Sequence, residues 1–231
     1  MPPRPTFDSA SAPATSAVTT SAVTTQSGAL RRQLLAAALV GMPALWLGAR
    51  AQPAPVRRPT PAQTEGPFYP VEFPKDADHD LLRNGKLMYP EGQASWLAGS
   101  VTDLQGRPVS GAQVEIWQCD GAGHYHHAGD GGLADTRFQG FGRVTAGADG
   151  SYRFRTIRPV AYSGRTPHIH VKVKLGSREL MTTHLQVADD AGNARDFLWR
   201  RLSDADRAAL TVPFALGADG LRASFSLVVN A

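Results

Sequence analysis

The sequence predicts an all-β protein: an antiparallel β-sandwich with an irregular N-terminal arm and a short C-terminal helix. Short runs that alternate apolar and polar residues recur from residue 95 onward, and glycine- and proline-rich turn sequences separate them. The chain has 23 glycines and 17 prolines, which suits many short strands joined by turns. Only one segment carries a good helix signal.

Residues 1–51 have the features of an export signal. A stretch of serine, threonine and alanine at 9–28 precedes two arginines at 31–32, an apolar run at 34–47 and the small residues "ARA" at 49–51. The run is shorter than the about 20 residues that a membrane helix needs, and paired arginines are typical of the twin-arginine route. We expect a twin-arginine signal peptide here and a periplasmic or extracellular protein. An amphipathic or anchoring helix is the alternative.

Residues 52–93 are predicted to be a linker and an arm. The stretch 52–62 ("QPAPVRRPTPA") has prolines that disfavour helix and sheet. The stretch 63–93 contains Gly66–Pro67 and many charges, which indicate an irregular arm over the sandwich. The catalytic β-sandwich domain is then expected over residues 94–231.

The strands of this domain are marked by alternation. The segments 111–118 ("GAQVEIWQ") and 151–157 ("SYRFRTI") alternate, and the Asp149–Gly150 pair before the second is a strong hairpin signal. Residues 221–229 alternate again at the C-terminus. The helix is expected over 203–210 ("SDADRAAL"), where a serine precedes an aspartate at the spacing of an N-terminal cap.

Charge and cysteine content exclude several classes of protein. The net charge of +4 arises mainly in residues 1–51, and the remainder carries 20 basic and 19 acidic residues. This balance gives no reason to expect a nucleic acid, or a membrane for the mature form, as partner. Cys119 is the only cysteine, so an intrachain disulfide and a thiolate metal cluster are excluded.

The stretch 168–175 ("HIHVKVKL") places two histidines on one face of a predicted strand. Alternate residues of a strand lie about 7 Å apart at the backbone, so His168 and His170 are near enough to bind one ion. Histidines on a solvated face beside Lys172 and Lys174 need no function, however, and an imidazole pair alone is weakly specific.

Tyrosines are the best candidates to complete such a site. Tyr125 ("DGAGHYHH") and Tyr162 ("PVAYSGR") both lie in loop sequences. A phenolate is a hard oxygen ligand that suits ferric iron, and two phenolates with one hydroxide would neutralise its charge in a buried site. No acidic residue stands at helical spacing from the histidines, and no serine has a nucleophile-elbow sequence, so a zinc protease and a serine hydrolase are not indicated.

Four motifs in one collinear order resemble the intradiol ring-cleavage dioxygenases, most closely the protocatechuate 3,4-dioxygenase β-subunit type. They are 64–70 ("TEGPFYP"), 106–127 ("GRPVSGAQVEIWQCDGAGHYHH"), 138–159 ("FQGFGRVTAGADGSYRFRTIRP") and 162–170 ("YSGRTPHIH"). The resemblance covers roughly residues 60–190. It implies a β-sandwich enzyme that uses non-haem ferric iron and dioxygen to cleave a catechol between its two hydroxylated carbons, giving a muconate.

The resemblance also implies roles for individual residues. Tyr125, Tyr162, His168 and His170 would be the iron ligands. Tyr162 would be the ligand that a catechol displaces, and it would then take a proton from the substrate. Arg165 would contact the substrate and stabilise negative charge on its ring. The family often forms dimers or larger assemblies, which allows a homo-oligomer here.

His184 is a departure from the family's pattern. The family often has a TTQ stretch after the histidine strand, and this chain has "TTHLQV" at 182–187, so His184 stands where a glutamine lines the substrate pocket. We expect it to contact substrate, with simple packing as the alternative.

Two other functions stay open at this point. The stretch 99–116 is also typical of a transthyretin-like binding module without catalysis, although such a module has no need for the two tyrosines, the arginine and the two histidines together. The second open function is that of an iron-binding protein that no longer turns over catechol.

Overall fold

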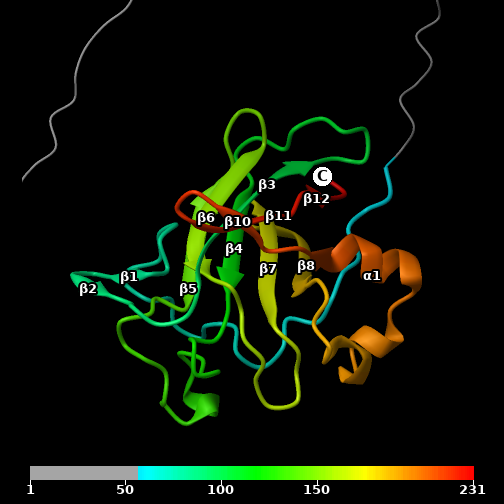
Figure 1. Cartoon of the computed structure of the whole chain (residues 1–231). Helices are drawn as coiled ribbons and strands as arrows, with labels where there is room; N and C mark the ends of the chain where they lie inside the picture. Colours follow the sequence, from blue (N-terminus) through cyan, green and yellow to red (C-terminus); the bar gives the residue numbers. More distant parts are fainter. Residues whose placement is uncertain (1–56) are drawn as a thin grey trace, which may run out of the picture. The chain divides into compact units, whose positions relative to one another are not determined.

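The computed structural model describes residues 57–231, so the expected signal peptide at 1–51 lies outside the described part. This part is mostly strand, with one α-helix and three single-turn 3-10 helices (Figure 1). No helix within it is long and apolar enough to span a membrane. The elements are β1 (Arg83–Asn84), β2 (Leu87–Met88), β3 (Ala94–Thr102), β4 (Gln113–Trp117), η1 (Ala128–Asp130), β5 (Phe141–Thr145), β6 (Ser151–Ile157), β7 (His168–Leu175), β8 (Arg178–Val187), η2 (Asn193–Arg195), η3 (Trp199–Arg201), α1 (Asp204–Leu210), β9 (Thr211–Val212), β10 (Ala215–Gly217), β11 (Gly220–Ser224) and β12 (Leu227–Val228).

Two five-stranded sheets and the β1–β2 hairpin contain all of these strands. One sheet has the order β10-β11-β3-β12, with β6 also paired to β3, and the other has the order β5-β4-β7-β8-β9. The prediction of a mostly-β fold is confirmed. The expectation of purely antiparallel pairing is wrong at three places, because β11 and β12 run parallel to β3, and β9 runs parallel to β8. No hairpin joins these strands to their parallel partners, because the segment with α1 separates β9 from β8, and β11 and β12 are far from β3 in the sequence. Alternation alone does not encode strand direction.

The main apolar core receives side chains from both sheets. Val114 and Ile116 of β4 and Val171 of β7 enter it from one sheet, and Leu97 of β3 and Phe154 of β6 enter it from the other. All five are fully buried, as the alternation of their strands predicts. The opposite face of the β4–β7–β8 sheet therefore carries the polar residues of these strands.

The helix signal is also confirmed. Helix α1 spans Asp204–Leu210, and the Ser203 side chain accepts a hydrogen bond from the backbone N–H of Asp206. This bond satisfies one of the free N–H groups at the start of the helix, as expected from the cap sequence.

The N-terminal segment from residue 57 to residue 82 forms no helix and no extended strand, and it covers the polar sheet face. Figure 1 shows it in cyan, passing from beside α1 across the ends of β8, β7 and β4 to the β1–β2 hairpin. Gln63 N–H donates to the Thr182 carbonyl of β8 at 2.8 Å, and the Tyr69 hydroxyl donates to the Glu115 carboxylate of β4 at 2.7 Å. The segment thus closes over the sheet through polar contacts.

A buried carboxylate anchors this segment. Glu115 is fully buried, and its carboxylate accepts hydrogen bonds from Tyr69, Arg143 (3.0 Å) and Lys174 (3.3 Å). Such a charge is tolerated only when it is paired and hydrogen-bonded, so the arrangement fixes where the arm crosses the sheet.

Candidate active site

Strand register gathers three imidazoles and an indole on the polar face of the β4–β7–β8 sheet. His170 of β7 lies directly opposite Trp117 of β4 on one side and His184 of β8 on the other. The His170 ring is stacked on Trp117 at 4.7 Å between centroids and lies 4.4 Å from the His184 ring. His168, two residues before His170, shares this face, as the alternation of 168–175 predicts.

The two histidines of β7 turn their Nε2 atoms toward each other. His168 Nδ1 lies 2.6 Å from the Thr166 carbonyl oxygen, which only accepts, so Nδ1 carries the proton and Nε2 presents a lone pair. The Nε2 atoms of His168 and His170 are 3.2 Å apart. Two nitrogens bound side by side to one ion at about 2.1 Å would be separated by roughly 3.0–3.6 Å. The observed separation is therefore suited to a shared metal ion.

A tight turn places Tyr162 and Arg165 next to each other. Tyr162 and Arg165 exchange two backbone hydrogen bonds, of 3.2 and 2.7 Å, across Ser163 and Gly164. These two central residues have φ of 39° and 78°, the left-handed conformation of a type I′ turn. The glycine is suited to this conformation, and Ser163 adopts it at a cost. The turn immediately precedes β7 and brings the Tyr162 ring to 5.4 Å from the His168 ring.

Tyr125 reaches the same place from the loop after β4. Its backbone N–H donates to the Asp130 carboxylate at 2.5 Å, and the ring of Phe68 from the arm is stacked on its ring at 4.7 Å. The Tyr125 ring lies 5.0 Å from the Tyr162 ring and 6.1 Å from the His170 ring. Its hydroxyl oxygen is buried and has no hydrogen-bond partner within residues 57–231. An unsatisfied buried hydroxyl is costly and calls for a ligand that it can bind.

Burial sets the protonation of these groups. It lowers the pKa of His168 to about 3, with repulsion from His184, were that ring protonated, and from the Arg165 guanidinium adding to the effect, and it lowers the pKa of His170 well below its usual range. Both imidazoles are therefore neutral near pH 7, which is the form that binds metals. Burial raises the pKa of Tyr125 well above its usual range and also raises that of Tyr162. A cation is thus needed to hold these phenols as phenolates near neutral pH.

His184 is tied to the arm. Its Nε2 lies 2.7 Å from the Thr64 carbonyl oxygen, so Nε2 carries the proton, and its Nδ1 is buried with no partner in the described structure. The contact joins β8 to the arm where Gly66 approaches His170: a Cβ added at Gly66 would come within 3.2 Å of His170 Cε1. His184 lines neither of the two cavities described below, so its predicted contact with substrate has no support from a cavity.

Arg165 is held by a carboxylate that the sequence analysis did not select. Its Nε donates to Asp196 Oδ2 at 2.8 Å, and the same carboxylate accepts from the backbone N–H groups of Thr166, Leu198 and Trp199. Asp196 is fully buried, and Arg165 Nη2 is buried without a partner among the described residues. One guanidinium donor is thus available beside Tyr162.

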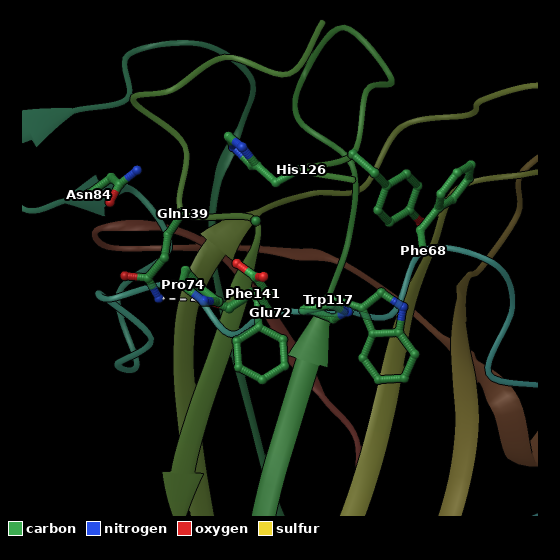
Figure 2. A pocket seen from close by; sticks show the side chains of 11 residues that line it. Phe68, Glu72, Pro74, Asn84, Trp117, His126, Gln139 and Phe141 are labelled. Carbon is green, nitrogen blue, oxygen red and sulfur yellow. Dashed lines mark hydrogen bonds between the residues drawn. The ribbon is translucent and has the colours of Figure 1, made fainter. Parts of the chain in front are cut away.

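Two cavities adjoin the cluster, one at Tyr125 and one at Tyr162. One, of about 220 Å³, lies between the arm and the ends of β4 and β5; Figure 2 shows Phe68, Trp117, His126 and Phe141 around it, and Tyr125 also lines it. The other, of about 510 Å³, is lined by Tyr162 and Arg165. Only the second reaches both of the side chains predicted to act on substrate.

The structure thus brings together all of the residues selected from the sequence: Tyr125, Tyr162, Arg165, His168, His170 and His184. Their roles stay predictions. Within residues 57–231, no group of three or more histidine, cysteine, aspartate and glutamate side chains is placed to hold a metal ion. The predicted set has two histidines and depends on two phenols, which suits a hard, highly charged ion rather than zinc.

Phe68, Trp117 and Asp196 are parts of the site that were not predicted from the sequence. Trp117 had a detectable signal, because it alternates onto the same strand face as Glu115, away from Val114 and Ile116. Asp196 had none, since its partner is 31 residues away in the sequence.

Comparison with known proteins identifies dioxygenases by sequence and by structure. A family model described as a dioxygenase matches residues 64–229. The protocatechuate 3,4-dioxygenase beta chain of Burkholderia cepacia is 36% identical over 163 residues, which cover 65% of this chain and 68% of that one. The hydroxyquinol 1,2-dioxygenase of Corynebacterium glutamicum is 32% identical over 149 residues, 57% of this chain, and this chain spans only 47% of its length.

Among solved structures, the dioxygenase domain of a dioxygenase–carbohydrate-binding protein fusion from Streptomyces sp. SirexAA-E superposes with a TM-score of 0.60 at 30% identity. The alignment covers 75% of this chain and 99% of that domain.

Proposed function

Because this chain belongs to the intradiol ring-cleavage dioxygenase family, we propose that it is an iron-dependent enzyme that cleaves a catechol-type ring between its two hydroxylated carbons with O₂, forming a muconate. The observation that carries this proposal is the convergence of two neutral imidazoles and two phenols. The Nε2 atoms of His168 and His170 lie 3.2 Å apart, and the rings of Tyr125 and Tyr162 lie 5.0 Å apart beside them.

The donor set fits ferric iron. His168, His170, Tyr125 and Tyr162 would hold the ion, and the unpartnered hydroxyl of Tyr125 would gain the ligand that it lacks. When bound, ferric iron would supply a Lewis acid that favours the deprotonated diol and prepares its ring for reaction with O₂. The Thr166 carbonyl would keep the proton of His168 on Nδ1, so that its Nε2 faces the metal.

Tyr162 is the ligand suited to leave. It is only partly buried and lines the 510 Å³ cavity, whereas Tyr125 is 2% exposed and is covered by Phe68. Its phenolate oxygen would accept a proton from a diol hydroxyl as the substrate binds. The raised pKa of Tyr162, which results mainly from burial, favours keeping that proton.

Arg165 would act on the substrate from the same side. Its Nε is fixed by Asp196, while its buried Nη2 has no partner in the described residues. A fixed, poorly solvated donor stabilises negative charge on a bound ring strongly, because it need not reorganise.

The remaining features of the proposal rest on the sequence. They are a twin-arginine signal over 1–51, export, a linker and arm over 52–93, a catalytic domain with the sandwich fold over 94–231, and assembly into a homo-oligomer.

The first experiment is a visible spectrum of the full chain purified aerobically with ferric iron. We expect a broad charge-transfer band from tyrosinate bound to iron, and a shift of that band when catechol is added. A colourless protein that holds one iron per chain would rule out Tyr125 and Tyr162 as ligands. A protein that binds no iron would favour the transthyretin-like binding module.

A further inference from the structure

Two loops form the walls of the 510 Å³ cavity beside Tyr162. The first is the turn at residues 161–166, and the second comprises residues 190–195, which follow β8 and include η2. Asp196 joins them, because it comes directly after the second loop and accepts hydrogen bonds from Arg165 and Thr166 of the first. The loops also touch at Gly192, where an added Cβ would come within 2.8 Å of the Thr166 side chain. The cavity is therefore built by packed segments.

Half of the lining residues are small: Ala161, Ser163, Gly164, Ala191 and Gly192. The volume of about 510 Å³ lies within the range for sites that take drug-sized ligands, and it exceeds what a bare catechol ring needs. A ring that engages Tyr162 and Arg165 would leave room for a substituent that extends toward the second loop.

Arg195 belongs to the second loop and lines the cavity. Its backbone is fixed, because its N–H donates to the Gly192 carbonyl at 2.8 Å and the next residue is the buried Asp196. Its side chain is exposed, and no hydrogen bond or ion pair joins it to any other described residue.

The neighbouring carboxylates do not neutralise Arg195 by direct contact. Asp196 directs both of its oxygens to Arg165 and to backbone N–H groups. Asp190, which also lines the cavity, accepts a hydrogen bond from the Gly192 N–H through one oxygen and makes no ion pair within 4.0 Å among the described residues. Its negative charge is the only one on the lining, beside the two positive charges of Arg165 and Arg195.

We propose that Arg195 is a specificity-determining residue that binds an anionic substituent, such as a carboxylate, on the ring of the catechol-type substrate. The inference rests on the proposed function. A planar guanidinium matches a carboxylate through two parallel hydrogen bonds, so an arginine on the cavity wall with no ion-pair partner among the described residues selects for that group. Arg165 stays assigned to the reacting ring.

The test compares two substrates of equal shape on the iron-loaded full chain. 3,4-Dihydroxybenzoate carries a carboxylate, and 3,4-dihydroxybenzamide carries a neutral amide in its place. We expect kcat/KM for the benzoate to exceed that for the benzamide. Arg195→Gln should lower the benzoate value about tenfold and leave the benzamide value within twofold, because a charge-assisted hydrogen bond is worth at least one factor of ten. Arg195→Lys should retain part of the preference.

Arg178→Gln is the matched control. Arg178 is exposed at the start of β8, six residues from His184, and it lines neither of the two cavities. The substitution removes the same charge and should leave the ratio of the two kcat/KM values unchanged. An equal loss in both arginine variants would point to long-range attraction and overturn the assignment.

A wild-type enzyme without preference for the benzoate would also overturn it, as would an Arg195→Gln variant that loses both substrates in equal proportion. These outcomes are distinct from failure of the proposed function, in which wild-type protein would show no charge-transfer band with iron and would cleave neither substrate.

Discussion

The contact between Asp196 and Arg165 yields the sharpest prediction about stability. Two carboxylate oxygens of Asp196 accept from the Arg165 guanidinium, the Thr166 N–H and hydroxyl, and the N–H groups of Leu198 and Trp199. Asp196→Asn keeps the shape but replaces one acceptor oxygen with an NH₂ group. If the remaining oxygen caps Leu198 and Trp199, the NH₂ group faces Arg165 and Thr166, which are donors themselves.

The expected cost follows from burial. The Asp196 side chain is fully buried, and the Arg165 side chain is only 10% exposed. Removing one partner of a buried ion pair typically costs about 3–5 kcal/mol, because the other charge is left uncompensated. For a domain of this size that loss lowers Tm by roughly 6–20 °C. Arg165→Met should cost less, since Asp196 would still accept from three backbone N–H groups.

Urea denaturation of the metal-free full chain measures this cost, with Asp204→Asn as control. Asp204 is almost fully exposed, and among residues 57–231 its one ion-pair partner is Arg207 at 3.1 Å, so its loss should change the free energy of unfolding by less than about 0.5 kcal/mol. The double variant Asp196→Asn/Arg165→Met should be more stable than the sum of the single losses predicts. Strict additivity, or a cost for Asp196→Asn no greater than that of the control, would refute the argument.

Three further predictions concern the site. Tyr162→Phe should keep iron and weaken catechol engagement, whereas His168→Ala should lower iron affinity at least about tenfold; equal iron content by metal analysis would contradict this division. In metal-free protein, the pKa values of His168 (about 3) and His184 (about 4) lie below the unfolded value of about 6.5, so the stability that these neutral rings provide is complete above that pH and is lost as the pH falls. Each of these two histidines should lower the free energy of unfolding by about 1.4 kcal/mol for every pH unit below pH 6. Between pH 7 and pH 5, the free energy of unfolding measured by denaturation should therefore fall less in His184→Gln than in the wild-type protein. Ser163→Gly should raise the free energy of unfolding by about 0.5–1 kcal/mol, because Ser163 has a φ of 39°, while Ser151→Gly in β6 should lower it.

Much of the site could be predicted because it depends on local sequence. Alternation in 168–175 placed His168 and His170 on one face, and the structure keeps them there. The link between Tyr162 and Arg165 is also local, since a four-residue turn holds both. A resemblance to a family then joined these segments to Tyr125, which alternation alone could not do.

The parts that could not be predicted depend on contacts between distant segments. The sequence places His184 in the stretch after the histidine strand, but only the pairing of β7 with β8 places it opposite His170. The direction of β9, β11 and β12 was missed for the same reason, since an alternating strand looks alike in parallel and antiparallel sheets. Asp196 lies in a short irregular segment where a single aspartate has no periodicity to distinguish it.

The two kinds of predicted ligand, imidazoles and phenols, are supported in different ways by the fold. The imidazoles project from paired strands and keep one geometry, because moving them would break the ladder between β7 and its two neighbours. The phenols come from loops, and of these Tyr125 is held by Phe68 and Asp130, whereas Tyr162 has a cavity on one side. The proposed role of Tyr162, as a ligand at one stage and a base at the next, would need such freedom, while Asp196 would keep Arg165 in place. Under the proposed function, the turn at Ser163 and the ion pair with Asp196 would form one support that holds Arg165 while Tyr162 leaves the metal.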